Sequence, residues 1–509
     1  MPRRKKIDLP FRKILIANRG EIACRVIRTC QRMGIKTVAV YSEADAPALH
    51  VQQADEAVLI GPPAVAESYL NIQAIIQAAR DTGTEAIHPG YGFLSENPDF
   101  TKACQATGIT FIGPSADNME LMGDKIRARQ VAQEAGLPLI PGTETEVSDQ
   151  EAIDIAPGIG FPLMVKAAAG GGGIGIRLVA TPDGLSEALT RARSQAESSF
   201  GSGHVYLEKY LEQPSHVEVQ VLADQHGNAV HLFERDCSVQ RRNQKVVEET
   251  PCRKLTKSKL NAMYEAALML VSHIDYVNAG TVEFLVDHSG AFYFLEMNTR
   301  LQVEHPITEM VTGLDLVEYQ IRIAAGQPLS LTQKNVSRKG HAIEARIYSE
   351  DPETLMPASG RVSILQEPSE KNIRVDGALF QGYEAAPYYD PMMAKVIAWG
   401  RTRKKAIERL NDALDSFTIE GVTHNIPLIQ QVLANQEFKD GSYSTPLLAH
   451  MSDEQGADAS RQEERETVAA VTTALGTIFG RTPQQRPSPW RTHGRAAQMM
   501  PWPTRGGRW

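Results

Sequence analysis

Apolar and polar positions alternate along the first hundred residues in a way that predicts strands and helices in turn. Short apolar runs rich in β-branched residues indicate buried strands, and apolar residues spaced three and four positions apart indicate helices. Strands that alternate with helices in this way are typical of a parallel sheet with helices on its faces. The predicted elements are strands at 14–17, 37–41 and 86–88 and helices at 21–33 and 71–80.

The middle third of the chain is richer in strands that follow one another closely, joined by turns that contain Gly or Asp. This pattern is typical of hairpins. Strands are predicted at 162–166, 205–209, 216–223, 229–234, 280–286 and 291–296, after a helix that ends at Ala135. From about residue 340 a mixed segment has predicted strands at 342–348 and 395–399 and a helix at 404–414. The predicted fold class is α/β, with an α+β central unit.

The composition changes after Met451. Residues 453–466 are polar and acidic, and apolar residues between Val468 and Phe479 then fall at the spacing of one helix face, so one helix is predicted. The remainder is rich in arginine and proline and contains Trp490, Trp502 and Trp509, three of the four tryptophans. Two interpretations stay open: a poorly ordered extension, or a segment that docks on a partner protein.

The overall composition is that of an ordinary globular protein. The 509 residues suggest three or four domains. A formal net charge of −8 argues against nucleic-acid binding as the main function. We find no apolar run of the roughly 18 to 20 residues that a membrane span requires. The five cysteines lack zinc-site spacing and the basic residues at 3–6 precede no secretory segment, so we expect reduced thiols and a cytoplasmic location.

A glycine run follows the predicted strand that ends at Lys166. It spans 170–173 and leads into a second strand, whereas a Walker loop or a dinucleotide loop would lead into a helix. A glycine flap between two strands brings backbone N–H groups close to nucleotide phosphates. A plain flexible hairpin is the alternative, and the Lys166 ammonium favours the phosphate interpretation.

Polar side chains recur at every second residue from Glu296 to Glu304, so an extended chain would project them all to one side. The alternative is an edge strand with a solvated face. Glu283 interrupts a neighbouring apolar strand, and a buried carboxylate needs a cation or another partner. Glu283, Glu296 and Asn298 would together offer the oxygen ligands that Mg²⁺ prefers, with ATP phosphates completing the shell. A salt bridge from Glu283 to a core cation is the alternative.

Two further groups of cations are candidates for anion binding. Arg242 and Lys245 come shortly before Glu248 and Glu249 and form either an anion pocket or a solvated loop. Arg346 begins the third part of the chain, and by itself it would be interpreted as a surface ion pair.

Taken together, these motifs resemble the biotin carboxylase family of ATP-grasp enzymes. The resemblance extends in order from about residue 11 to residue 451, and it is carried by 16–23, 88–97, 123–125, the glycine flap, 208–211, 234–238 and 296–306. It implies an N-terminal α/β domain (1–121), an ATP-grasp domain (122–338) with a mobile lid at about 138–212, a C-terminal domain (339–451) and the tail (452–509).

The resemblance also implies a site for ATP, bicarbonate and biotin, with Mg²⁺ or Mn²⁺. Glu283, Glu296 and Asn298 are expected on the metal, and Lys245, Arg300, Gln302 and Val303 on bicarbonate. Glu304 is the expected base, and Arg346 is expected to stabilise the biotin enolate, so that Arg300, Glu304, Lys245 and Arg346 form the catalytic set. The residues expected around the nucleotide are Lys125, Lys166, Gly170, Gly171, Gly172, Gly173, Glu208, Lys209, Leu211, His216, Gln240 and Glu283.

The sequence departs from the family pattern at three positions. Ile174 stands where the family usually has Arg or Lys, Ala169 precedes the flap glycines, and Asn243 stands where the family usually has His. None of them is an expected metal ligand or catalytic residue, so we expect activity with an altered affinity for ATP.

The chain contains no Met-Lys pair of the kind to which biotin is attached, and its last lysine is Lys439. We therefore expect it to act on a separate biotin carboxyl carrier protein, alongside carboxyltransferase subunits, and to form a homodimer. Acetyl-CoA is the leading final acceptor, ahead of propionyl-CoA and pyruvate. Two other functions stay open: another ATP-grasp ligase, such as a carbamoyl-phosphate synthase, and a catalytically silent nucleotide-binding subunit.

Overall fold

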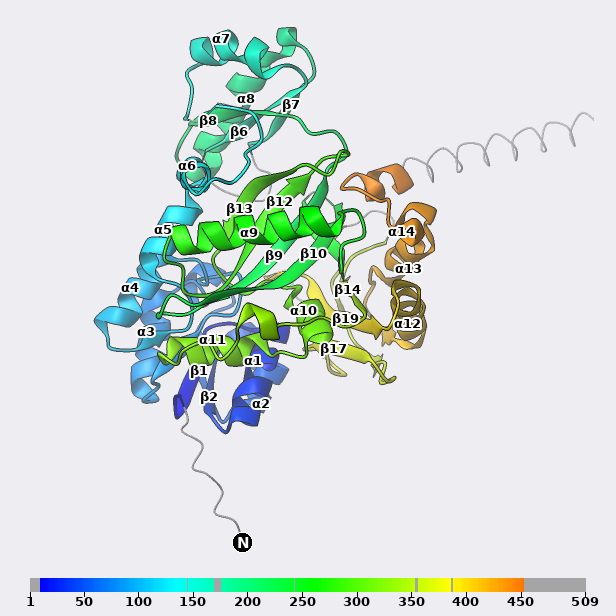
Figure 1. Cartoon of the computed structure of the whole chain (residues 1–509). Helices are drawn as coiled ribbons and strands as arrows, with labels where there is room; N and C mark the ends of the chain where they lie inside the picture. Colours follow the sequence, from blue (N-terminus) through cyan, green and yellow to red (C-terminus); the bar gives the residue numbers. More distant parts are fainter. Residues whose placement is uncertain are drawn as a thin grey trace, which may run out of the picture. The chain divides into compact units, whose positions relative to one another are not determined.

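The computed structural model describes residues 10–452, except 144, 169–174, 242, 353–355 and 386–387 (Figure 1). The chain divides into two units, Met1–Ala449 and His450–Trp509, and the description below concerns the first. The flap glycines 170–173, Ala169, Ile174, Arg242 and the predicted tail helix lie outside the described residues.

The N-terminal part contains the parallel sheet that the sequence predicted, with strand order β3-β2-β1-β4-β5. Its core strands are apolar because helices cover both faces. The order reverses between β1 and β4, and ligands bind at such a point in α/β folds. The strands are β1 (Lys13–Ile16), β2 (Lys36–Ser42), β3 (Glu56–Gly61), β4 (Ala86–His88) and β5 (Thr110–Phe111); the helices are α1 (Gly20–Met33), α2 (Leu49–Gln53), α3 (Ile72–Asp81), α4 (Pro98–Ala106) and α5 (Ala116–Gly123).

An eight-stranded antiparallel sheet joins the middle and the C-terminal parts, with order β13-β12-β9-β10-β11-β14-β19-β17. The join is the β11–β14 pair, in which Glu248 lies opposite Glu344. The two predicted regions are therefore continuous through hydrogen bonds. The strands are β9 (Ser215–Ala223), β10 (Ala229–Arg241), β11 (Gln244–Thr250), β12 (Asn278–Val286), β13 (Phe292–Asn298), β14 (His341–Tyr348), β17 (Ile373–Gly377) and β19 (Met392–Gly400).

Helices cover this sheet, and Figure 1 shows α9 running across β9, β10, β12 and β13. Met263 and Leu270 of α9 pack on Val219 and Val282 of the strands beneath. Burying this apolar face holds the helix on the sheet. The helices of this part are α6 (Lys125–Glu134), α9 (Lys257–His273), α10 (His305–Thr312), α11 (Leu316–Ala324), α12 (Arg403–Ser416), α13 (Ile426–Ala434) and α14 (Gln436–Asp440).

A separate three-stranded antiparallel sheet, ordered β7-β6-β8, forms the segment in which the sequence predicted a lid. It has its own apolar core, in which Leu163 and Leu207 pack with Leu189. The predicted glycine run connects β6 to β7, two antiparallel neighbours, so it joins two strands as expected. The elements are α7 (Asp149–Ile159), β6 (Leu163–Ala167), β7 (Arg177–Val179), α8 (Leu185–Phe200) and β8 (Val205–Lys209).

Short elements complete the described part. The pairs are β15 (Gly360–Arg361) with β18 (Glu384–Ala385) and β16 (Ile364–Gln366) with β20 (Thr418–Glu420), and the 3₁₀ turns are η1 (Glu43–Asp45), η2 (Val65–Glu67), η3 (Pro182–Gly184) and η4 (Gln333–Asn335). Among the described residues, no helix has both the length and the apolar character needed to cross a membrane.

Candidate active site

A cavity of about 870 Å³ lies where the lid sheet, the eight-stranded sheet and the loops after β1 and β4 meet. Cavities of this size hold small-molecule ligands in other proteins. Of the predicted site residues that the structure describes, Glu304 alone is not part of the lining, because it is completely buried behind it. The lining includes Lys125, Lys166, Glu208, Lys209, Leu211, His216, Gln240, Lys245, Glu283, Glu296, Asn298, Arg300, Gln302, Val303 and Arg346.

The expected metal ligands come from two paired strands. Glu283 of β12 lies opposite Glu296 of β13, and Asn298 follows two residues later on the same face. Burial raises the pKa of Glu296, and the neighbouring Glu283 carboxylate raises it further. A buried carboxylate and a half-buried one that disfavour each other's charge, beside an amide oxygen, form a donor set that suits a hard divalent cation.

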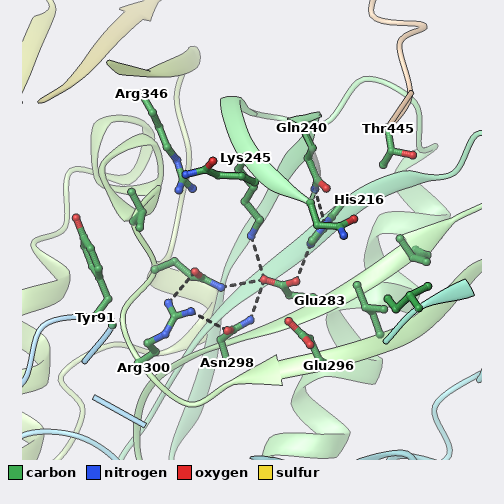
Figure 2. Close-up of a pocket in the computed structure, with 18 of the residues that line it drawn as sticks. Tyr91, His216, Gln240, Lys245, Glu283, Glu296, Asn298, Arg300, Arg346 and Thr445 are labelled. Atoms are coloured by element: carbon green, nitrogen blue, oxygen red, sulfur yellow. Dashed lines mark hydrogen bonds and ion pairs between the residues drawn. The ribbon is translucent and has the colours of Figure 1, made fainter. Parts of the chain in front are cut away.

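Glu283 also has the cationic partners that the salt-bridge interpretation required. Figure 2 shows Lys245, His216 and Asn298 converging on it. Its Oε1 accepts from Lys245 Nζ at 3.0 Å and from Asn298 Nδ2 at 2.8 Å, and its Oε2 lies 2.8 Å from His216 Nε2. Burial would lower the pKa of His216, but the Glu283 carboxylate raises it overall.

Lys245 is the central cation of the site. Its Nζ lies 2.6 Å from Glu218 Oε2, 3.0 Å from Glu283 Oε1 and 2.6 Å from Glu304 Oε1. Burial alone would lower the pKa of Lys245, but these carboxylates raise it well above its ordinary value. The ammonium therefore stays charged in a largely buried position, where its side chain is 11% exposed.

The sequence placed Lys245 near Glu248 and Glu249, but the structure gives those two acids other partners. Glu248 accepts from Arg346 Nε at 2.5 Å, and Glu249 accepts from Arg403 Nε at 2.6 Å. Glu248 and Glu249 occupy successive positions of β11, so their side chains leave opposite faces of the sheet.

Arg346 is buried, so its interpretation as a surface ion pair is wrong. Its Nη2 donates to Glu304 Oε2 at 2.9 Å, while Lys245 binds the other oxygen of Glu304. Burial by itself would raise the pKa of Glu304, but Lys245, Arg346 and Arg235 hold it well below its ordinary value. A carboxylate is thus fixed between two cations that line the cavity, directly behind its wall.

The predicted single extended segment from Glu296 to Glu304 is wrong beyond Asn298, where β13 ends. Glu96 accepts from the Thr299 backbone N–H at 2.9 Å and from Arg300 Nε at 2.9 Å, which bends the chain before α10. The polar side chains converge nonetheless, because the bend returns Gln302 Nε2 to within 2.9 Å of Glu283 Oε1.

The lid contributes a second group of charges. Lys166 Nζ is paired with Glu208 Oε2, and Glu208 also accepts from Arg129. Lys209 Nζ donates to the carbonyl oxygens of Gly160 and Phe161, at 3.2 and 3.1 Å. Burial lowers the pKa of Lys125, and the nearby Lys166 ammonium lowers it further. Several ammonium groups therefore surround one end of the cavity, where polyphosphate charge would be neutralised.

The same chain regions match known protein families. Residues 10–119 match the biotin carboxylase N-terminal domain, residues 124–332 the carbamoyl-phosphate synthase L chain ATP-binding domain, and residues 344–450 the biotin carboxylase C-terminal domain. The biotin carboxylase of Halalkalibacterium halodurans is 51% identical over 441 residues, which cover 86% of this chain and 98% of the relative. This chain belongs to the biotin carboxylase family. It is accordingly an ATP-dependent ligase.

Other members of the biotin carboxylase family are similar over most of the chain. The propionyl-CoA carboxylase alpha chain of Ruegeria pomeroyi is 47% identical over 485 residues, 91% of this chain and 71% of the relative. A crystal structure of the Campylobacter jejuni biotin carboxylase with β-γ-ATP has a TM-score of 0.85 at 45% identity, and it covers 86% of this chain and 99% of that one. A second crystal structure shows the biotin carboxylase domain dimer of Hydrogenobacter thermophilus 2-oxoglutarate carboxylase with MgADP, ADP and bicarbonate. Its TM-score is 0.84 at 46% identity, and the match covers 86% of this chain and 97% of that one.

Sequence reasoning missed one acid of this biotin carboxylase site. Glu218 is fully buried on β9 and binds both Lys245 and Arg235 Nε, the latter at 2.5 Å. Its signal was available: His216, Glu218 and Gln220 alternate with valines, so one face of this strand is polar. Asn243, where the family usually has His, lies at φ 66° in the turn between β10 and β11 and lines the cavity. Asn adopts this left-handed conformation readily.

Proposed function

We propose that this chain uses ATP, Mg²⁺ and bicarbonate to carboxylate biotin on a separate carrier protein, by way of carboxyphosphate. The observation that carries the proposal is Glu304 held between Lys245 and Arg346, two cations that line the cavity in front of it. The Glu304 carboxylate is a base for the bicarbonate proton, and the Lys245 ammonium can bind the bicarbonate anion. The Arg346 guanidinium can stabilise the negative charge of the biotin enolate beside them.

The nucleotide would lie between the lid and the sheet. We assign Lys125, Lys166, Glu208, Lys209, Leu211, His216 and Gln240 to its binding, with the flap glycines 170–173. Glu283, Glu296 and Asn298 would hold Mg²⁺, which neutralises phosphate charge when bound. The carboxylate pair supports this assignment, since a cation would offset both the desolvation and the repulsion from Glu283 that raise the pKa of Glu296.

Bicarbonate would bind at Lys245, Arg300, Gln302 and Val303, next to Glu304. The lowered pKa of Glu304 makes it a weak base while Lys245 is its direct partner. A bicarbonate oxygen that accepts from Lys245 would share that positive charge, and the pKa of Glu304 would rise. Binding would thereby prepare the carboxylate to take the bicarbonate proton, and the oxyanion so formed attacks the γ-phosphate.

Biotin would approach Arg346. Carboxyphosphate breaks down to CO₂ and phosphate, and the phosphate takes the N1′ proton of the ureido ring. The guanidinium of Arg346 would stabilise the enolate that results, until the ring nitrogen captures CO₂. Bulk water must be excluded because carboxyphosphate hydrolyses, and a closing lid serves that purpose.

We propose domain boundaries at 1–121, 122–338 and 339–451, with a lid at about 138–212, and the ranges matched by the family models support them. A separate carrier protein and separate carboxyltransferase subunits are part of the proposal, and the relative named for biotin carboxylase alone, 98% of which matches this chain, supports them. A relative with a biotin carboxylase domain dimer supports a homodimer. Free thiols at all five cysteines support a cytoplasmic location.

Acetyl-CoA is the final acceptor that we propose, with propionyl-CoA and pyruvate as alternatives. Relatives named for biotin carboxylase alone, for propionyl-CoA carboxylase and for pyruvate carboxylase are all similar to this chain. The choice of acceptor lies with the carboxyltransferase.

The test is bicarbonate-dependent ADP release by the purified chain with Mg²⁺, with and without free biotin. We expect biotin to stimulate turnover in the parent and to have no effect in Arg346→Ala. Arg191→Ala is the matched control, because that arginine is 67% exposed on the lid helix. Turnover indifferent to biotin in the parent would point instead to another ATP-grasp ligase. No turnover in the parent would point to a silent nucleotide-binding subunit.

A further inference from the structure

Lys395 is a completely buried lysine that lies behind the cavity rather than in its lining. On β19 it lies between Arg346 of β14 and Asp376 of β17 in the cross-strand register. Asp376 is already paired with Arg374 and Arg28. A buried ammonium is costly unless it is paired, so its own partners indicate its role.

The two direct partners of Lys395 both belong to the wall of the cavity. Its Nζ donates to the backbone carbonyl of Val303 at 2.7 Å and lies 3.0 Å from Glu21 Oε1. Val303 is in the loop between β13 and α10, and Glu21 is in the first turn of α1. One side chain on β19 thus connects a loop of the ATP-grasp region to the N-terminal domain.

Glu21 extends this connection to Tyr91. The Tyr91 hydroxyl donates to the same oxygen, Glu21 Oε1, and the Lys395 ammonium lies 5.8 Å from the centre of the Tyr91 ring. Glu21 Oε2 has no hydrogen-bond partner among the described residues, so Oε1 carries both contacts. Figure 2 shows Tyr91 at the edge of the pocket away from Gln240 and Thr445.

We propose that Lys395 is a positioning residue, which fixes the Val303 peptide at the bicarbonate subsite and, through Glu21, the Tyr91 ring at the cavity wall. This inference rests on the proposed function. Holding the Val303 carbonyl from behind sets the orientation of the peptide between Gln302 and Glu304, the two side chains that flank it. Residues that orient the groups contacting a substrate act by this kind of outer contact.

The experiment measures KM for bicarbonate and for ATP separately, in full-length variants whose folding is checked by thermal unfolding. We expect Lys395→Met to raise KM for bicarbonate about tenfold and to leave KM for ATP within about twofold of the parent. Lys13→Met is the matched control, because Lys13 Nζ also joins a carbonyl, Thr82 O at 2.7 Å, to a carboxylate, Glu56 Oε1 at 2.7 Å, away from the cavity.

Two further variants keep the test decisive. Lys395→Met leaves Glu21 buried without its cation, so the double variant Lys395→Met/Glu21→Gln removes both charges and should fold while keeping the bicarbonate defect. Tyr91→Phe removes only the hydroxyl contact to Glu21 and leaves the contact from Lys395 to the Val303 carbonyl, so we expect KM for bicarbonate to stay within about twofold of the parent.

The inference is overturned if a folded Lys395 variant has the parental KM for bicarbonate, or if KM for ATP rises equally. It is also overturned if Lys13→Met shows the same rise, or if neither Lys395 variant folds, since Lys395 would then serve the fold alone. A parent chain without bicarbonate-dependent turnover overturns the proposed function and this inference together. An active parent with unaffected variants overturns the inference alone.

Discussion

Lys245 Nζ lies 2.6 Å from Glu304 Oε1, so the proposed base and the central ammonium of the site form a direct ion pair. The same ammonium lies 3.0 Å from Glu283 Oε1, a proposed metal ligand. One cation therefore connects the place where a proton is taken to the place where a metal is held. In so buried a cluster, a change of charge at one carboxylate is felt at the other.

Glu304→Gln should reduce bicarbonate-dependent ATP turnover by about 10² to 10⁴-fold, the usual contribution of a general base. The amide keeps the shape of the side chain but cannot take a proton. Affinity for ADP, measured by calorimetry, should stay near that of the parent. Glu120→Gln is the control, because that carboxylate is 44% exposed on α5. Parental turnover in Glu304→Gln would exclude it as the base.

The Mg²⁺ concentration that turnover requires should increase when Glu296 is substituted. A chelator should abolish turnover, and restored Mg²⁺ should recover it. In Glu296→Gln the Mg²⁺ concentration for half-maximal turnover should rise about tenfold, because the proposed metal ligands lose one carboxylate charge. A titration curve identical to that of the parent would remove Glu296 from the metal site.

Lys245→Met should destabilise the protein in addition to inactivating it. The substitution leaves Glu218, Glu283 and Glu304 without their shared cation, and breaking buried ion pairs in this way costs about 3 kcal/mol or more of unfolding free energy. Denaturant unfolding measures the loss. The double variant Lys245→Met/Glu218→Gln should recover part of it, whereas equal loss in both variants would contradict the shared-cation arrangement.

Glu344 should make stability depend on pH. Burial raises its pKa well above the ordinary value, with the Lys395 ammonium opposing the rise and the Glu248 carboxylate adding to it. Neither carboxylate oxygen has a hydrogen-bond partner among the described residues. The folded protein therefore keeps this acid protonated at pH values where the unfolded chain, with a pKa of about 4.3, has lost the proton.

The sign follows from that difference. The stability contributed by Glu344 is fully present below about pH 4 and is lost as the pH rises toward the raised pKa, by up to about 1.4 kcal/mol per pH unit. Glu344→Gln carries no such dependence. Between pH 5 and 9, the unfolding free energy of the parent should therefore fall relative to that of Glu344→Gln as the pH rises. Glu384→Gln, at a carboxylate that is 73% exposed, should show a constant difference, and a constant difference for Glu344→Gln would refute the prediction.

Periodicity along the chain was sufficient for much of the fold. Strands β1, β2 and β4 of the parallel sheet and most hairpin strands of the middle third, though not β11, were predicted because burial imposes a period of two or 3.6 on local sequence. β3 was missed, since this strand is exposed or half-buried over most of its length, and β5 was missed because it has only two residues. The motifs were sufficient for the family and for naming fifteen of the residues that line the cavity.

Local patterns determined neither where β13 stops nor what each charge touches. The extended pattern from Glu296 to Glu304 ends at Asn298 because Glu96, about two hundred residues earlier, binds the bend. Lys245 pairs with Glu218, Glu283 and Glu304 rather than with its near neighbours in sequence.

The sequence by itself thus determined the elements, the family and the chemical groups of the site. Only the tertiary structure decided which acid meets which cation, and it alone revealed Lys395 behind the wall. The physical reason is that these ion pairs join residues far apart in the sequence. They form only because the sheet topology and the packing of the domains bring their strands together. Periods of two and 3.6 residues specify which face of an element is buried, but they carry no information on which distant element will cover it.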